Sequence, residues 1–222
     1  MSRVLALQKG IRFCVSGEQV ILLDLRTERY FALPSGCNDA FRRWLTDEAI
    51  GEPEMQYLQR LVQKDILCVT VHEQSRADSR TLSPDVPTNR IDTSLVRSSP
   101  WRVVEAIGAR MVWAWRAKHW RFKRQVHHLE NVAKRRKRSQ YGEIGAITRA
   151  FELSDLILGS HDKCMERSFA MVSVLRKYGV SAQAIIGVQN APFAAHCWVQ
   201  DGETVLNEEP DRVQLFTPIL VI

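Results

Sequence analysis

Cys164 begins a stretch of apolar residues at helical spacing, CMERSFAMVSVLRKYG, which ends at Gly179. A thiolate is stabilised in the first turn of a helix, because unpaired backbone N–H groups and the helix dipole favour negative charge there. The preceding loop, Gly159-Ser160-His161-Asp162, offers N-cap residues that would start the helix at this point. Position alone leaves two interpretations of Cys164 open, a nucleophile and a buried thiol.

A cysteine nucleophile requires a base within hydrogen-bond reach. His161 is three residues away and is expected in the loop, whereas His196 begins a predicted strand and can face a helix N-terminus across the fold. Its neighbour Cys197 should point to the opposite face of that strand, so we expect it in the core. A metal site of Cys164, His161 and His196 is a rival interpretation, but the sequence shows no compact ligand spacing for it.

The segment around His196 reads as a hairpin, with HCWVQ and ETVLNE as its arms. Asp201 and Gly202 mark the turn, which lies far from His196, so Asp201 is expected to be a turn residue. The end of the second arm should lie beside His196, where an acceptor could fix the tautomer of the imidazole. Three residues cluster there: Asn207, Glu208 and Glu209.

The elements before residue 74 predict a small α+β domain, 1–73. Residues 11–16, 19–25 and 29–33 are rich in β-formers and predict three strands. Apolar residues at helical spacing predict helices within 37–49 and 53–69. The result is a three-stranded sheet with helices, a winged-helix-like arrangement.

Residues 74–99 are rich in Ser, Thr, Asp and Arg and predict a linker, followed by a second domain over 100–222. A helical pattern over 101–122 carries apolar residues on one side and basic residues on the other. We expect this helix to pack on the second domain; a helix on a membrane surface is the alternative, because Trp with Arg and Lys is typical of one. The run KRRKR at 134–138 predicts a solvated face without a nucleic-acid motif.

The composition of the 222 residues is that of an ordinary globular protein, with 45% hydrophobic residues. No run of about 18 apolar residues is present, and the N-terminus does not resemble a secretory signal. Five scattered cysteines without a CxxC pair favour a reducing compartment. A net charge of +6 suits an acidic peptide, nucleic acid or a membrane surface, and does not choose among them.

Residues 155–215 resemble the B proteins of lasso-peptide biosynthesis, which are leader peptidases with a transglutaminase-like cysteine-protease fold. The resemblance rests on a cysteine at the head of an arginine-containing helix, on IIGV, and on PF-x-x-H-x-WV followed by a DG turn and V-x-N-acid. It implies a catalytic triad of Cys164, His196 and Glu208, with glutamate where the family has aspartate. Asn207 is the alternative third residue, by analogy with papain-like Cys-His-Asn sites.

The N-terminal domain resembles the PqqD-like domains that recognise leader peptides, through GEQVILLDLRTERYFALPSGCNDAFRRW. Such domains bind the leader as an added strand beside their third strand and against their last helix. Residues 28–33 would be the edge strand that receives it. The resemblance implies these leader-binding residues: Tyr30, Phe31, Ala32, Leu33, Arg60 and Lys64.

Together, the two resemblances imply a bacterial, cytoplasmic cysteine peptidase that removes the leader of a lasso precursor without a cofactor. An ATP-dependent macrolactam synthetase would then close the ring. ATP itself is not expected to bind this chain, which has no phosphate-binding glycine loop. We expect neither nucleic acid nor a stable membrane association. The alternatives are an amidase or acyltransferase with the same Cys-His site, and a leader-binding scaffold of weak activity.

Overall fold

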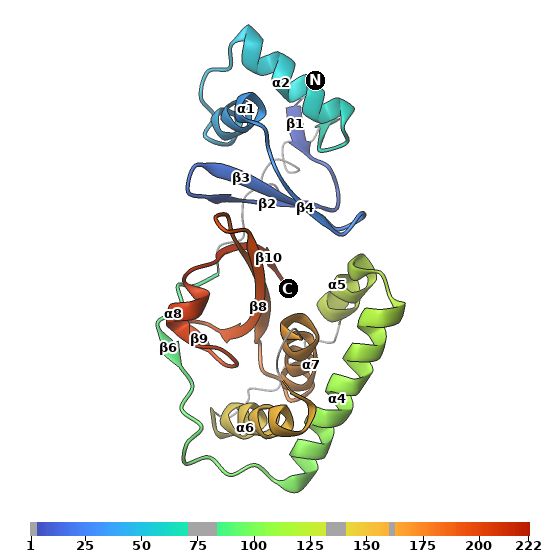
Figure 1. Ribbon diagram of the computed structural model, residues 1–222, viewed down its shortest axis with the longest axis vertical. Helices are drawn as coiled ribbons and strands as arrows, with labels where there is room; N and C mark the ends of the chain where they lie inside the picture. The colour runs from blue at the N-terminus through green and yellow to red at the C-terminus, as the bar shows by residue number, and fades with distance from the viewer. Residues whose placement is uncertain (1–3, 71–83, 132–140, 160–162) are drawn as a thin grey trace. The chain divides into compact units, whose positions relative to one another are not determined.

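The computed structural model describes residues 4–70, 84–131, 141–159 and 163–222 (Figure 1). The chain splits into two compact units, Met1–Leu82 with Asn190–Pro192 and Ser83–Gln189 with Phe193–Ile222. Both contain helices and small sheets, so the predicted α+β class is confirmed. Within the described residues, no helix has the length and apolar character needed to cross a membrane.

The first unit contains a three-stranded antiparallel sheet in the order β2-β3-β4. Its strands are β2 (Ile11–Ser16), β3 (Gln19–Asp24) and β4 (Arg29–Ala32), which agree with the predicted ranges to within one residue at each end. Two further strands, β1 (Val4–Leu7) and β5 (Leu67–Thr70), form a separate antiparallel pair.

Two helices, α1 (Ser35–Leu45) and α2 (Glu52–Gln63), follow the sheet. The prediction that the second helix extends to residue 69 is wrong, because α2 ends at Gln63 and Asp65 adopts a left-handed conformation with φ of 55°. The chain changes direction there, and Leu67–Thr70 form β5. A four-residue strand whose partner residues lie 60 or more positions away leaves little local signal.

The core of the first unit joins both helices to the sheet. Phe41 and Trp44 of α1 pack with Leu58 and Leu61 of α2 against buried strand residues. Asn38 links α1 to the β2–β3 hairpin, because its Oδ1 accepts a hydrogen bond from the backbone N–H of Val20 (2.7 Å) and its Nδ2 donates to the carbonyl of Glu18 (3.0 Å). The winged-helix-like arrangement remains a prediction.

The second part of the predicted linker packs on the second unit. Asn89–Arg90 form β6, which pairs in parallel with β9 (Thr204–Val205), and Ile91 beyond it is buried. The Thr93 hydroxyl donates to both carboxylate oxygens of Glu152, at 2.9 and 2.7 Å. Two buried residues, Ile91 and Thr93, and a two-residue strand are too few to produce periodicity, so the polar composition of residues 84–99 predicts a linker.

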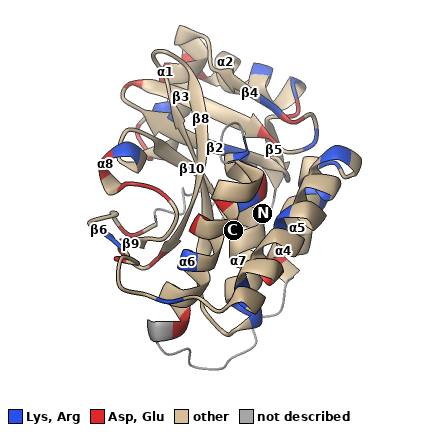
Figure 2. Cartoon of the chain, turned by 60° about the horizontal axis from the view of Figure 1, so that its bottom comes forward, with Lys and Arg blue, Asp and Glu red and all other residues tan. Residues whose placement is uncertain are grey.

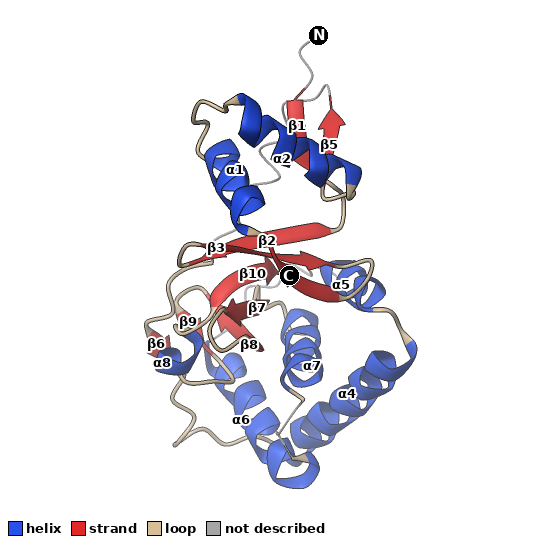
Figure 3. Cartoon of the chain, turned by 45° about the horizontal axis from the view of Figure 1, so that its top comes forward, coloured by secondary structure: helices blue, strands red, loops and turns tan. Residues whose placement is uncertain are grey.

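The second unit is built on a five-stranded sheet in the order β10-β7-β8-β9-β6 (Figure 3). Its long central strands, β7 (Gln183–Gln189) and β8 (Ala194–Asp201), pair antiparallel. β10 (Thr217–Val221) flanks β7, and the short β9 continues from β8 through a tight turn. Gly202 opens that turn with φ of 58°, a conformation that favours glycine.

Helices cover this sheet, and α7 (Cys164–Lys177) contacts β7 and β8 directly (Figure 1). Three more helices surround α7: α4 (Pro100–His119), α5 (Phe122–Asn131) and α6 (Tyr141–Leu158). The 101–122 helix packs on this domain as predicted, but through Ala106, Arg110 and Trp113. The apolar side expected to face the domain is instead exposed, at Trp101, Val104, Met111 and Trp115. A one-turn helix, α8 (Pro210–Val213), leads to β10.

Candidate active site

Cys164 is the first residue of α7, and its side chain is half-buried. Lys163 occupies the N-cap position without a side-chain cap hydrogen bond. Residues 160–162, in which the cap was expected, lie outside the described residues, as does the alternative base His161. Because the Lys163 side chain does not cap the helix, it does not occupy the backbone N–H groups of the first turn. These groups can stabilise a negative charge on the Cys164 sulfur.

The surroundings of the Cys164 sulfur favour the thiolate. Burial raises the pKa of the thiol, but hydrogen bonds from His196 and from the backbone N–H groups of Cys197 and Met165 outweigh it. The resulting pKa lies below the ordinary value. A thiol with a lowered pKa in a partly accessible position has the properties of a nucleophile.

His196 lies in β8 and is 9% exposed. Its Nε2 is 2.9 Å from Oε2 of Glu208, which leaves Nδ1 for the thiol of Cys164. Burial lowers the pKa of His196, but its bonds to Cys164 and Glu208 raise the pKa to about 9. The lowered thiol pKa and the raised imidazole pKa both favour the thiolate–imidazolium pair over the neutral pair.

Glu208 follows β9, and its carboxylate is charged in this environment. Burial raises its pKa, whereas the hydrogen bond with His196 and the charge of Arg212 lower it to a value below the ordinary one. Arg212 Nη1 lies 3.2 Å from Oε2 of Glu208. A charged carboxylate at this distance can fix the orientation and tautomer of the imidazole.

Asn207, the alternative third residue, has a different set of contacts. Its Oδ1 accepts a hydrogen bond from the backbone N–H of Val199 (2.7 Å), and its Nδ2 donates to Oγ of Ser168 (2.9 Å). Of the two residues that the sequence left open, the structure therefore brings Glu208 to His196. Asn207 joins β8 to α7.

The first two turns of α7 bind the edge of β8 that β9 leaves uncovered. Ser168, which is fully buried, donates from Oγ to the carbonyl of Cys197 (3.1 Å), and the N–H of Cys197 faces the sulfur of Cys164. A residue of an antiparallel strand directs both backbone groups to the same edge, so Cys197 presents both to α7. These contacts fix Cys164 beside His196.

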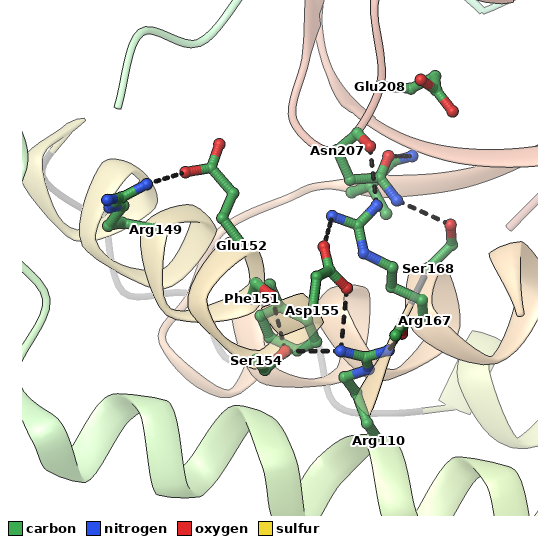
Figure 4. Close-up of polar contacts among 12 residues, drawn as sticks. Arg110, Arg149, Phe151, Glu152, Ser154, Asp155, Arg167, Ser168, Asn207 and Glu208 are labelled. Carbon is green, nitrogen blue, oxygen red and sulfur yellow. Dashed lines mark hydrogen bonds and ion pairs between the residues drawn. The ribbon is translucent and has the colours of Figure 1, made fainter. Parts of the chain in front are cut away.

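A buried ionic chain supports the same region (Figure 4). Asp155 of α6 lies between two guanidinium groups, with Oδ1 2.9 Å from Nη1 of Arg110 and Oδ2 2.6 Å from Nη2 of Arg167. Arg167 then donates to the carbonyl of Asn207 (2.8 Å), the residue before Glu208. The chain thus links α4, α6 and α7 to the loop that carries the acceptor of His196.

Two aromatic rings cover the imidazole. The ring centroids of Trp198 and Phe216 lie 6.4 and 5.4 Å from that of His196. Gly187, opposite His196 in β7, makes room for them, since a Cβ there would lie 2.8 Å from both Phe216 Cβ and the Trp198 ring. Apolar rings shield the imidazole from water and strengthen its electrostatic contacts.

Cys197 and Asp201 lie outside the triad. The side chain of Cys197 is buried, and burial raises the pKa of its thiol. Asp201 is the last residue of β8, directly before the turn at Gly202. Among the described residues, no group of three or more His, Cys, Asp or Glu side chains could hold a metal ion.

The predicted leader-binding residues lie in the first unit and differ in exposure. Tyr30 and Phe31 are half-buried, and Phe31 packs on the core. Ala32, Arg60 and Lys64 are exposed.

Leu33 does not fit the role predicted for it. Its side chain is only 4% exposed, its N–H donates to the carbonyl of Val20, and its own carbonyl accepts from Nε2 of Gln19. Because both its side chain and its backbone are used within the unit, Leu33 is a core residue.

Sequence reasoning missed the residues that support the site: Arg110, Asp155, Arg167, Ser168, Gly187 and Phe216. Arg167 carried a weak signal, because it interrupts the apolar face of a predicted helix and would need a buried partner. Arg110 carried none, because it lies on the basic side of the predicted 101–122 helix. The helix α6, which supplies that partner, was not predicted.

Comparisons with known proteins agree with this geometry. Residues 107–221 match the transglutaminase-like superfamily, and this range includes Cys164, His196 and Glu208. The chain belongs to this superfamily. The match begins within α4 and ends in the last strand, and all of it except residues 190–192 belongs to the second unit.

A curated relative supports the comparison with lasso-peptide proteins. The microcin J25-processing protein McjB of Escherichia coli is 32% identical over 65 residues, which cover 27% of this chain and 31% of that protein. The alignment therefore spans about a third of the length of the relative. No solved structure matches the chain significantly.

Proposed function

We propose that this protein is a cysteine peptidase that removes the leader from a lasso-peptide precursor. The hydrogen-bonded series Cys164–His196–Glu208 carries the proposal, because it joins an activated thiolate, a base and an orienting carboxylate. The similarity to a microcin-processing protein supports the choice of substrate. In this proposal Cys164 is the nucleophile, His196 the acid–base and Glu208 the residue that orients it.

In the first step, the thiolate of Cys164 attacks the carbonyl carbon of the last leader residue. A C–S bond forms and the carbonyl oxygen becomes an oxyanion, which the backbone N–H of Cys164 can stabilise at the start of α7. The imidazolium of His196 gives its proton to the nitrogen of the scissile bond. The C–N bond then breaks, and the core peptide leaves with a free N-terminal amine.

In the second step, neutral His196 takes a proton from water, and the resulting hydroxide attacks the thioester. The C–S bond breaks, which releases the leader as a carboxylic acid and returns the thiolate–imidazolium pair. Glu208 stays charged in both steps, because it stabilises the imidazolium without accepting its proton.

In this proposal the first unit binds the leader along β4. Within the described residues, β4 pairs only with β3, and Leu33 N–H bonds to Val20 toward that strand. In an antiparallel strand, the N–H and C=O groups of successive residues point alternately to one edge and the other. The N–H and C=O of Ala32 therefore point away from β3, to the edge of β4 where an added strand could pair. Arg60 and Lys64, exposed on and directly after α2, would attract acidic residues of the leader.

Two partners follow from this proposal, the lasso precursor and an ATP-dependent synthetase that closes the macrolactam ring. Joining leader recognition and cleavage in one chain raises the local concentration of the bound precursor at Cys164. The core released in the first step carries the free amine that ring closure needs.

A second candidate is acyl transfer to an amine, because the superfamily is named for transglutaminases. The thioester intermediate is the same, and only the nucleophile of the second step differs. A site that excludes water from His196 with Trp198 and Phe216 would favour such a transfer.

One experiment separates these candidates. Precursor peptides encoded beside this gene are incubated with the full chain, with and without an added small primary amine, and the products are weighed by mass spectrometry. The peptidase predicts a leader ending in a carboxylic acid and a core with a new N-terminus. If the main product is instead the leader joined to the added amine through an amide bond, acyl transfer is supported.

A further inference from the structure

The outward face of α4 is apolar along most of its length. Buried Ala106, Arg110 and Trp113 form the opposite face, against the second unit. Five exposed apolar residues lie at positions 101, 104, 111, 112 and 115, and this spacing places them on one side of a helix. They and their exposed fractions are Trp101 (72%), Val104 (56%), Met111 (61%), Val112 (48%) and Trp115 (54%).

Contiguous exposed apolar side chains of this size mark an interaction surface. The helix does not need them for packing, since its other face already contacts α6 and α7. Gly108 lies at the middle of this outward face, and a Cβ there would meet no atom within 4 Å. A Trp residue stands at each end of the face.

The charged residues that follow along the chain, from 106 to 129, are all basic. Between Glu105 and Glu130 the sequence contains no Asp or Glu. The end of α4 and the start of α5 instead carry exposed cations, Lys118, Arg121, Lys123 and Arg124 (Figure 2). No ion pair joins Lys118, Arg121 or Lys123 to a carboxylate of the described residues.

We propose that the outward face of α4, together with this basic cluster, binds the surface of an anionic membrane. The exposed apolar residues would enter the interfacial layer, where Trp is preferred, and the four cations would contact acidic lipid headgroups. The face is a ridge on one helix, and a lipid surface accepts a ridge without a complementary groove. The basic charge disfavours a second copy of the chain as the occupant, because the two basic clusters would repel each other.

This inference is independent of the peptidase proposal, because it uses none of the residues of the active site. It would hold the enzyme at a membrane surface through a helix that lies in the interface. The Trp and basic residues that suggested an interfacial helix from sequence lie on this face and at its end.

Vesicle sedimentation of the full chain tests the proposal. Vesicles of phosphatidylcholine alone are compared with vesicles that contain an equal amount of phosphatidylglycerol, at low and high salt. We expect binding to the anionic vesicles only, weakened by salt, with a blue shift of the Trp fluorescence. Replacing both Trp101 and Trp115 with Ala, or both Lys118 and Arg121 with Glu, should weaken binding by about tenfold or more.

The matched control replaces Leu156 and Ile157 with Ala; they are 83% and 64% exposed and belong to a different helix, α6. Binding of this control should equal that of the wild type, and all variants should keep the alkylation rate of Cys164, which reports an intact fold. Three results would overturn the proposal: equal binding to neutral vesicles, no loss in either α4 variant, or self-association through α4 without vesicle binding. Capture of an acidic protein with no affinity for anionic vesicles would overturn it as well.

Discussion

The carboxylate of Glu208 lies 2.9 Å from Nε2 of His196, although strand pairing does not hold the two residues together. The β8–β9 ladder covers only Gln200–Val205 and Asp201–Thr204. Beyond it, Asn207 bonds to Val199 and receives a hydrogen bond from Arg167. The acceptor of the imidazole is therefore placed by the loop contacts of the residue before it.

Replacing Glu208 with Gln should lower kcat/KM for precursor cleavage by on the order of 100-fold, within the range for positioned acid–base groups. The amide can still accept a hydrogen bond, but it removes the charge that stabilises the imidazolium. Initial rates from mass spectrometry would measure the loss. An unchanged rate would show that Glu208 does not orient His196.

The reactivity of Cys164 should have a distinctive pH dependence. Because the thiol pKa is lowered and the His196 pKa is raised to about 9, the ion pair persists between these two values. Alkylation by iodoacetamide should therefore stay fast to a lower pH than for an ordinary thiol, and fall as the pH drops below the lowered thiol pKa. Cleavage, which needs the imidazolium, should decline as the pH rises through about 9.

The Glu208→Gln variant is the control for this profile. Loss of the carboxylate lowers the pKa of His196, so the alkaline decline of cleavage should move to lower pH. An alkylation rate that follows an ordinary thiol pKa, in wild type and variant alike, would contradict the ion pair.

Replacing Gly187 with Ala should destabilise the second unit by about 1–3 kcal/mol, the usual cost of overpacking. Its Cβ would come within 2.8 Å of Phe216 Cβ and of the Trp198 ring, two groups that cover His196. Urea unfolding measures the change. Gly108→Ala is the matched control: its Cβ meets open space in the middle of α4, so this variant should be more stable than the wild type by roughly 0.5–1 kcal/mol.

Replacing Asp155 with Asn should cost about 3–5 kcal/mol, because it leaves two largely buried guanidinium groups without their shared carboxylate. Arg110 and Arg167 have side-chain exposures of 5% and 13%. The comparison variant is Arg149→Gln on the same helix, which removes an exposed pair with Glu152 and should change stability by less than about 1 kcal/mol. Equal effects of the two variants in urea unfolding would show that the ionic chain does not stabilise the unit.

Sequence patterns predicted the elements with strong local signals. The strands of the first sheet are rich in β-formers and end at turn residues, and α7 combines helical spacing with a C-terminal Gly179. The placement of Cys164 at a helix start and of His196 on the facing strand followed from the same patterns. The structure brings these two residues together.

The parts that sequence missed depend on distant contacts. Whether residues 67–70 continue a helix or form β5 is decided by pairing with β1. Residues 89–90 become a strand only because β9 lies beside them. Likewise, the role of Asp155 depends on two arginines from other helices, which no local pattern could reveal.

The most direct test of the account compares Cys164→Ala with Cys197→Ala, two cysteine variants at the same site. The precursor is incubated with each full-length variant, cleavage is followed by mass spectrometry, and leader binding is measured separately with a fluorescent leader peptide. We predict that Cys164→Ala binds the leader with wild-type affinity but does not cleave the precursor, and that Cys197→Ala, if folded, does both. Cleavage by Cys164→Ala at the wild-type rate would contradict the proposed mechanism.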